Sequence, residues 1–190
     1  MAELRFDDRV AVITGAGRGL GRAYALLLAS RGAKIVVNDP GASLQGESTD
    51  TGPAQEVVRE IKAAGGEAVA CTESVATREG GKAIIESALE HYGRIDILFN
   101  NAGFGRILWH DRMQPEHDID RQIAVNLLGV IHAAQAVLPD MLEQQSGVIL
   151  NASSVVGIYG NFGQTNYAAS KFGVIGFTKT WSRELGPKGI

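Results

Sequence analysis

Ser154, Tyr167 and Lys171 are the residues of this chain whose types and spacing could do chemistry together. Tyr167 and Lys171 are four residues apart, so a helix would place both side chains on one face. A free phenol loses its proton near pH ~10, and a nearby ammonium group favours the phenolate. Such a phenol suits proton transfer with an alcohol oxygen near neutral pH. The Ser154 hydroxyl, 13 residues before Tyr167 (167 − 154), could donate a hydrogen bond to that same oxygen.

Packing is the alternative explanation for the segment that carries Tyr167. Small and apolar residues form a helical stripe there: Ala169, Phe172, Gly173, Gly176, Phe177, Thr180 and Trp181. The segment 166–185 is apolar around most of its girth, which predicts that one face is buried against another subunit.

A glycine-rich turn, TGAGRGLG, follows the first apolar run of the chain. The common dinucleotide pattern GxGxxG does not fit, because Leu20 stands where its last glycine would be. The spacing GxxxGxG fits instead, through Gly15, Gly19 and Gly21. Glycines let the backbone approach a pyrophosphate, which then lies on the amides at the start of the next helix. The turn, Leu20 included, is therefore expected to bind a dinucleotide; an ordinary glycine-rich turn is the alternative.

Asp39 is the candidate residue for choosing the coenzyme. It lies 18 residues beyond Gly21 (39 − 21), at the end of the second apolar run. A carboxylate there accepts hydrogen bonds from the adenosine ribose and repels the 2′-phosphate of NADP. Arg18 favours a phosphate, and Asp39 before Pro40 could also be only a turn residue. The carboxylate is the stronger effect, so we expect NAD, with NADP less favoured.

Strand and helix patterns alternate along the chain. Five short runs, apolar at consecutive positions, predict strands buried on both faces: 10–14, 34–38, 67–71, 95–99 and 148–151. Helical patterns cover 19–30, 53–64, 78–92 and 115–144, and a polar loop covers 40–52. This order predicts an α/β fold of the Rossmann type, a doubly wound parallel sheet in three αβα layers.

Composition excludes several classes of protein. The 190 residues predict one domain, and the net charge of −3 without a basic cluster argues against nucleic acid. The apolar runs are too short to span a bilayer, so we expect no membrane contact. Cys71 is the single cysteine and the N-terminus lacks a signal-peptide pattern, so we expect a cytoplasmic location. The four histidines match no metal-ligand spacing. Trp109 and His110 either border a substrate pocket or lie in a surface loop, and the surface loop is the favoured explanation.

Three motifs in order carry a family resemblance. With TGAGRGLG, NNAG at 100–103 and YAASK at 167–171, the chain resembles the short-chain dehydrogenase/reductase family from about Asp7 to its last residue. Within that family, VVNDPG and SSVVGIYGNFGQTNYAASK are similar to the (3R)-hydroxyacyl-CoA dehydrogenase part of peroxisomal multifunctional enzymes and their bacterial relatives.

The resemblance implies further cofactor contacts. Asn101, Ala102 and Gly103 would line the cofactor after the fourth strand. Ser74 and Val75 stand where many members have Asp-Val against the adenine, and a serine there can still make one hydrogen bond.

The resemblance also implies a catalytic group of Ser154, Tyr167 and Lys171. Asn126, in VNLLG, would lie at a slight break in its helix and hold a water. Family members commonly form homodimers or homotetramers through the helix 166–185.

We therefore expect an NAD(H)-dependent oxidoreductase that interconverts a secondary alcohol and a ketone, with a 3-hydroxyacyl-CoA as the favoured small-molecule substrate. A steroid, a sugar or a cyclic ketone is an alternative substrate, and a non-catalytic nucleotide-binding scaffold is an alternative function. Family members continue with further strands, so we expect 1–190 to be one catalytic domain that is truncated at its C-terminus, with the strand 148–151 at an exposed edge.

Overall fold

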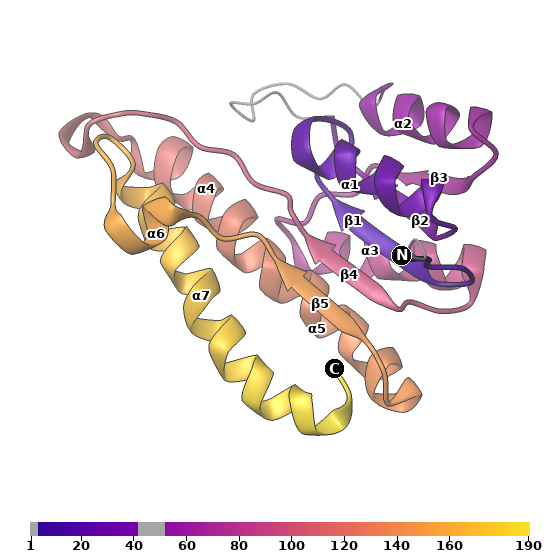
Figure 1. Ribbon diagram of the computed structural model, residues 1–190. Helices are drawn as coiled ribbons and strands as arrows, with labels where there is room; N and C mark the ends of the chain where they lie inside the picture. The colour runs from indigo at the N-terminus through magenta and orange to yellow at the C-terminus, as the bar shows by residue number, and fades with distance from the viewer. Residues whose placement is uncertain (1–3, 42–51) are drawn as a thin grey trace.

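A computed structural model of the chain describes residues 4–41 and 52–190 and confirms the expected parallel sheet (Figure 1). Most of the predicted loop 40–52 lies outside the described residues. The strands are β1 (Val10–Thr14), β2 (Lys34–Asn38), β3 (Glu67–Cys71), β4 (Ile97–Asn100) and β5 (Val148–Asn151). They pair in the order β3-β2-β1-β4-β5, and every pair is parallel.

Helices cover both faces of this sheet (Figure 1). Ala11 and Ile13 of β1 pack in one core cluster with α1 (Gly19–Ser30) and α2 (Gly52–Ala63). Val10 and Val12 point the other way, into a cluster with α3 (Arg78–Tyr92) and α5 (Gly129–Gln144). The alternation of β1 side chains between two apolar layers explains why the four consecutive positions from Val10 to Ile13 are all apolar.

The fourth strand begins two residues later than the sequence predicted. Asp96 precedes it, and its buried carboxylate accepts hydrogen bonds from Val10 N at 2.9 Å and from Arg9 Nη1 and Arg94 Nη2 at 2.7 Å. The Asp96 backbone also bonds to the first residues of β1 and β5, through Asp96 N to Val10 O and Val148 N to Asp96 O, both at 2.9 Å. Asp96 therefore fixes the ends of three neighbouring strands with its side chain and its backbone.

The predicted helix 115–144 is helical throughout but has four parts. A π-helical turn over Pro115–Asp120 leads into α4 (Arg121–Ile123), a second π-helical turn spans Ala124–Leu128, and α5 follows. By length and composition alone Pro115–Gln144 could cross a membrane, although apolar core helices of globular proteins pass the same test. Here α5 packs against the sheet and α3.

The site is positioned by the order of the strands. The chain passes from β3 at one edge back across the sheet to β4, which lies beside β1. Open α/β sheets bind ligands at such a switch point, outside the carboxyl ends of the strands. The carboxyl ends of β1 and β4 carry the glycine turn and the NNAG motif.

Candidate functional site

The glycine turn after β1 has a backbone that other residues would strain or block. Gly15 and Gly19 have φ values of +64° and +55°. A Cβ on Gly15 would lie 2.8 Å from the Cα of Ala102, and one on Gly21 would overlap the carbonyl of Gly15. The spacing GxxxGxG therefore reflects both left-handed backbone and close approach between segments.

Thr14 and Asn101 fasten this turn to the end of β4. The Thr14 hydroxyl accepts from the backbone N–H groups of Asn101 at 3.1 Å and Ala102 at 3.0 Å. The Asn101 side chain donates to the carbonyls of Thr14 and Gly15. Asn101 thus holds the backbone of the predicted cofactor turn in place by hydrogen bonds to its carbonyl groups. Sequence reasoning missed Thr14, whose signal was a hydroxyl at the end of an apolar strand.

The start of α1 fits a pyrophosphate. Arg18 is the N-cap residue and makes no side-chain capping bond to the helix. Leu20, in the first turn, is 68% exposed. A Cβ on Gly19 would meet no atom within 4 Å, so open space lies beside the first residue of α1, where an anionic group could approach the helix amides.

Asp39 lies where a ribose-binding carboxylate is expected. Its Oδ2 accepts from Gly17 N at 2.9 Å, and its Oδ1 accepts from Gly41 N at 2.8 Å. The second bond is the local turn that was the alternative explanation. The first bond places the Asp39 carboxylate against the glycine loop, and its contact with a ribose stays a prediction.

Ser74 and Val75 follow β3. The Ser74 hydroxyl accepts from Ala76 N at 3.3 Å, within its own turn. Val75 is buried, and a Cβ on Gly129 would lie 2.8 Å from its Cγ2. Packing against α5 accounts for the Val75 side chain, and the adenine contact of this pair stays a prediction.

Tyr167 and Lys171 both lie on α7 (Thr165–Leu185), as their spacing predicted. Lys171 is 4% exposed, its Nζ donates to Ala152 O at 2.8 Å, and Nζ lies 5.8 Å from the centroid of the Tyr167 ring. Burial lowers the pKa of Lys171 to about 8, so the ammonium form still predominates at pH 7.

Ser154 is brought to the same place by the residues before it. Ala152 accepts the hydrogen bond from Lys171 Nζ, and Ser153 Oγ donates to the Lys171 carbonyl at 2.8 Å. Ser154 then begins the short helix α6 (Val155–Tyr159), with its hydroxyl accepting from Val156 N at 3.2 Å. The backbone just before Ser154 is therefore fixed to Lys171 at the carboxyl end of β5, and the joint action of the Ser154 hydroxyl with the Tyr167 phenol stays a prediction.

Asn126 lies in the second π-helical turn, where a helix break was expected, and is fully buried. Its Oδ1 accepts from Phe104 N at 3.0 Å and its Nδ2 donates to Phe104 O at 2.8 Å. A Cβ on Gly103 would lie 3.3 Å from Asn126 Oδ1 and 3.4 Å from Lys171 Nζ. The three residues meet, and the water-holding role of Asn126 stays a prediction.

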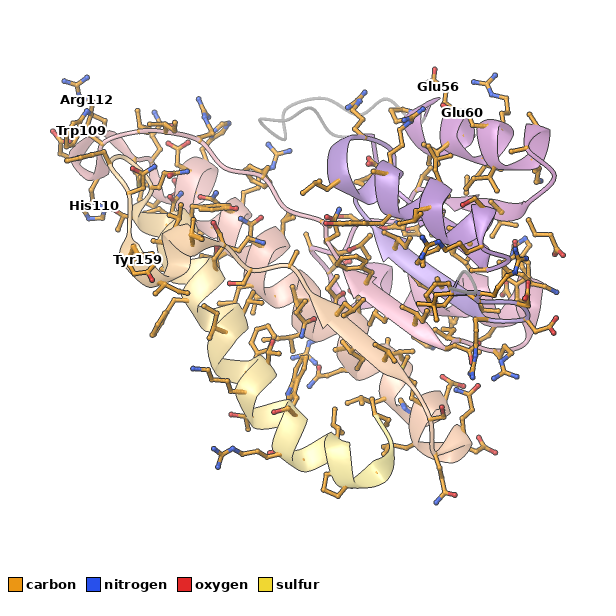
Figure 2. The ribbon with its side chains drawn as sticks, viewed as in Figure 1. Glu56, Glu60, Trp109, His110, Arg112 and Tyr159 are labelled. Atoms are coloured by element: carbon orange, nitrogen blue, oxygen red, sulfur yellow. The ribbon has the colours of Figure 1, made fainter. Side chains whose placement is uncertain are left out.

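An apolar rim surrounds the outer end of α6. It consists of six exposed residues: Ile107, Trp109, Val155, Ile158, Tyr159 and Phe162. Trp109 and Phe162 have ring centroids 6.0 Å apart, and Leu108 N donates to Gly163 O at 2.9 Å. Figure 2 shows Trp109, His110 and Tyr159 at this end of the molecule. Trp109 is 58% exposed, which agrees with the favoured surface-loop explanation, and a border with a substrate pocket stays a prediction.

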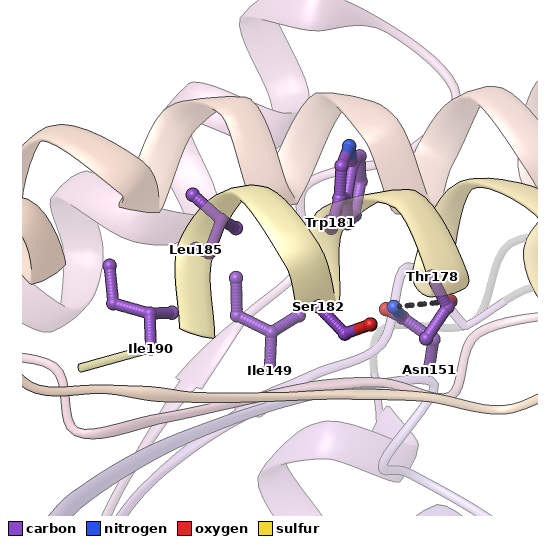
Figure 3. Close-up of a pocket in the computed structure, with 7 residues that line it drawn as sticks. All are labelled: Ile149, Asn151, Thr178, Trp181, Ser182, Leu185 and Ile190. Carbon is purple, nitrogen blue, oxygen red and sulfur yellow. Dashed lines mark hydrogen bonds between the residues drawn. The ribbon is translucent and has the colours of Figure 1, made fainter. Parts of the chain in front are cut away.

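A separate cavity lies between β5 and the end of α7 (Figure 3). Its lining residues are Ile149, Asn151, Thr178, Trp181, Ser182, Leu185 and Ile190. None of them belongs to the predicted site. Residues 4–41 and 52–190 bring together no group of three His, Cys, Asp or Glu side chains that could hold a metal ion.

Comparisons with known proteins bear on the family and the fold of this chain. The family model described as short chain dehydrogenase matches residues 9–190. The peroxisomal hydratase-dehydrogenase-epimerase of Neurospora crassa is 51% identical over 185 residues, which are 97% of this chain and 20% of the relative. A 3-oxoacyl-(acyl-carrier-protein) reductase of Thermotoga maritima is 44% identical over 98% of this chain and 72% of its own length.

Among solved structures, a 7α-hydroxysteroid dehydrogenase in complex with NADH and 7-oxo glycochenodeoxycholic acid matches with a TM-score of 0.88 and 34% identity. The match covers 98% of this chain and 69% of that one. The chain spans about a fifth of the length of the Neurospora crassa relative.

Proposed function

This chain belongs to the short-chain dehydrogenase family, and from that membership we propose that it binds a nicotinamide dinucleotide and interconverts a secondary alcohol and a ketone. The observation that carries the proposal is the meeting of Tyr167 and buried Lys171 on one helix. The NNAG segment links this pair to the glycine turn, since a Cβ on Gly103 would lie 3.4 Å from Lys171 Nζ and one on Gly15 would lie 2.8 Å from the Cα of Ala102. A scaffold that only binds nucleotides would have no need for this arrangement.

Each residue of the group has a proposed role. The bound nicotinamide supplies the acceptor or donor of the hydride. Tyr167 exchanges the proton with the alcohol or ketone oxygen, and Ser154 donates a hydrogen bond to that oxygen. Lys171 holds positive charge near the phenol and, with three donors, is suited to the nicotinamide ribose hydroxyls.

NAD is the proposed coenzyme. The Asp39 carboxylate against the glycine loop supports it, because a 2′-phosphate there would meet a fixed negative charge. Exposed Arg18 in the same loop is the residue that would favour NADP.

A 3-hydroxyacyl-CoA or a related acyl thioester is the proposed substrate. The names of the Neurospora crassa and Thermotoga maritima relatives support acyl chemistry, and the apolar rim beside Ser154 suits a substrate with an apolar body. A steroid is the second candidate, supported by the hydroxysteroid dehydrogenase match and the same rim.

Turnover with a panel of secondary alcohols tests the proposal. Protein, NAD and either 3-hydroxybutyryl-CoA or a hydroxysteroid are mixed, and NADH absorbance is followed, with NADP in a parallel series. We expect turnover with NAD that Tyr167→Phe abolishes while cofactor binding is kept. Cofactor binding without turnover of any substrate would instead favour the scaffold.

Association through α7 is proposed for the assembled protein. Phe172 is 61% exposed on this helix, and Ala169, Gly176 and Thr180 of the predicted stripe are exposed as well. Gly173 and Trp181 of the stripe pack inward instead, against Leu127 and the core. A homodimer or homotetramer would bury this face. The cytoplasmic location, and the assignment of 1–190 as a single catalytic domain truncated at its C-terminus, stay predictions.

A further inference from the structure

Three buried polar residues form a stripe behind the proposed acid/base. Asp118, Gln122 and Asn126 are spaced four residues apart in the helical segment that begins at Pro115, and they are 6%, 1% and 0% exposed. We propose that this polar stripe holds Tyr167 from two sides, with Gln122 and Asp118 as positioning residues beside Asn126. The inference rests on the proposed role of Tyr167.

The first side is the backbone that packs on the phenol ring. Gln122 Nε2 donates to Phe104 O at 2.7 Å, and Asn126 Nδ2 donates to the same oxygen at 2.8 Å. The next residue, Gly105, lies on the ring: a Cβ there would be 3.2 Å from Cδ2 and 3.5 Å from Cε2 of Tyr167. The side-chain amides of Gln122 and Asn126 thus fix the Phe104 carbonyl, and with it the position of the Gly105 backbone against the Tyr167 ring.

Packing alone does not explain the glutamine. Its Oε1 is buried and has no hydrogen-bond partner among the described residues. Burying an unpaired amide oxygen costs stability, and a leucine or methionine of similar volume would avoid that cost. The remaining contribution of Gln122 is the hydrogen bond from its Nε2 to Phe104, which a leucine cannot make.

The second side is the backbone of Tyr167 itself. Buried Asn166 donates through Nδ2 to the carbonyl of Asp118 and accepts through Oδ1 from Tyr167 N at 2.9 Å. The N-cap residue of α7, Gln164, makes no side-chain capping bond. Asn166 therefore satisfies an amide in the first turn of α7 and fastens that turn to the stripe.

The two sides are joined by Asp118, whose main-chain carbonyl bonds to Asn166 and whose carboxylate bonds to the segment before the stripe. Its Oδ1 accepts from Arg106 Nη1 at 3.1 Å, and its Oδ2 accepts from Gln114 N at 2.9 Å. Because Arg106 follows Gly105, one aspartate restrains both the backbone over the ring and, through Asn166, the helix turn under it. A displacement of about 1 Å at a reacting group costs up to about a hundredfold in rate, so this restraint bears directly on turnover.

Gln122→Leu is the first test in the full-length protein. We expect kcat to fall about tenfold, from the loosened ring position, with the KM for NAD and the melting temperature unchanged. Labelling with 3-fluorotyrosine adds a direct readout, since the ¹⁹F resonance of Tyr167, assigned with Tyr167→Phe, should shift or broaden. Gln135→Leu, at an exposed position of α5, is the matched control and should change neither kcat nor the resonance.

Two further variants keep the test decisive if Gln122→Leu does not fold. Asn166→Asp keeps the acceptor for Tyr167 N but turns an oxygen toward the Asp118 carbonyl. Gly105→Ala crowds the ring without removing a polar group. Both should move the same resonance and lower kcat, whereas an unmoved Tyr167 resonance in the folded variants would overturn the inference.

Failure of the proposed function would look different. If the wild-type protein oxidises no alcohol with NAD or NADP, the assignment of the reaction fails. The ¹⁹F resonance still reports whether the stripe positions the Tyr167 ring, because it needs no turnover.

Discussion

Lys171 is a buried cation, and its burial has a measurable effect on stability. Burial lowers the pKa of Lys171 from 10.5 to about 8, so the folded protein disfavours the charged form. Below pH 8 both the folded and unfolded chains carry the proton, and folding bears the full cost of burying it. Between pH 8 and 10.5 the unfolded chain binds more protons than the folded one, so stability rises with pH.

Lys171→Met is expected to remove that dependence. The free energy of unfolding of the wild type, minus that of the variant, should increase by about 3 kcal/mol from pH 8 to pH 10.5, at about 1.4 kcal/mol per pKa unit. Urea denaturation of both proteins across this range measures it. A difference that stays flat with pH would show that Lys171 titrates as an exposed lysine.

Asp39 is expected to set the choice between coenzymes. Asp39→Asn keeps an oxygen for Gly17 N and removes the negative charge that a 2′-phosphate would meet. The ratio of kcat/KM for NAD to that for NADP should fall by about tenfold or more, which corresponds to about 1.4 kcal/mol. Glu73→Gln, an exposed change beyond β3, serves as the charge-matched control. An unchanged ratio in Asp39→Asn would show that another residue chooses the coenzyme.

At the scale of elements, Asn151 joins two strands and a helix. Its Oδ1 accepts from Asn100 Nδ2 at 2.9 Å, and its Nδ2 donates to Thr178 Oγ1 at 3.0 Å, across the cavity of Figure 3. The carboxyl ends of β4 and β5 are thereby fixed to α7, the helix that carries Tyr167.

Asn151→Leu should destabilise the protein because it leaves the Asn100 amide without its partner in a buried place. The expected loss is about 1–3 kcal/mol in the free energy of unfolding, measured by urea denaturation. Thr178→Val removes only one arm of the network and should cost less. Equal losses in the two variants would contradict a bridging role for Asn151.

At the scale of the whole molecule, two apolar surfaces are open to association. One is the α7 face around Phe172, and the other is the edge strand β5, where Val148 and Leu150 are 49% and 44% exposed. An unpaired edge strand is a template for pairing with another chain. The exposed edge at 148–151 was predicted from the sequence, and the strand order confirms it.

Light scattering after size exclusion should separate these two surfaces. We expect Phe172→Glu to lower the mass toward that of one chain, because a charge on the α7 face prevents its burial. Leu150→Lys should leave that association intact. If only Leu150→Lys lowers the mass, the chains associate through the sheet edge and the α7 proposal is wrong.

Local pattern was enough to predict much of this protein. Four of the five strands have the predicted bounds, since consecutive apolar runs between glycine-rich turns leave few alternatives. The positions of Gly15, Gly21, Tyr167 and Lys171 followed from spacing, because a tight turn and one helix face depend on neighbours along the chain.

Only the tertiary structure decided which polar residues support that site. Thr14, Gln122 and Asn166 carry no motif, and each bonds to a partner that lies 18 to 88 residues away along the chain. The π-helical turns within 115–128 likewise arise where buried side chains bond to the segment after β4, and no local propensity encodes that contact. Spacing along the chain was enough to predict which groups react, because one turn or one helix face depends only on neighbouring residues. How firmly those groups are held depends on contacts between distant segments, which only the tertiary structure reveals.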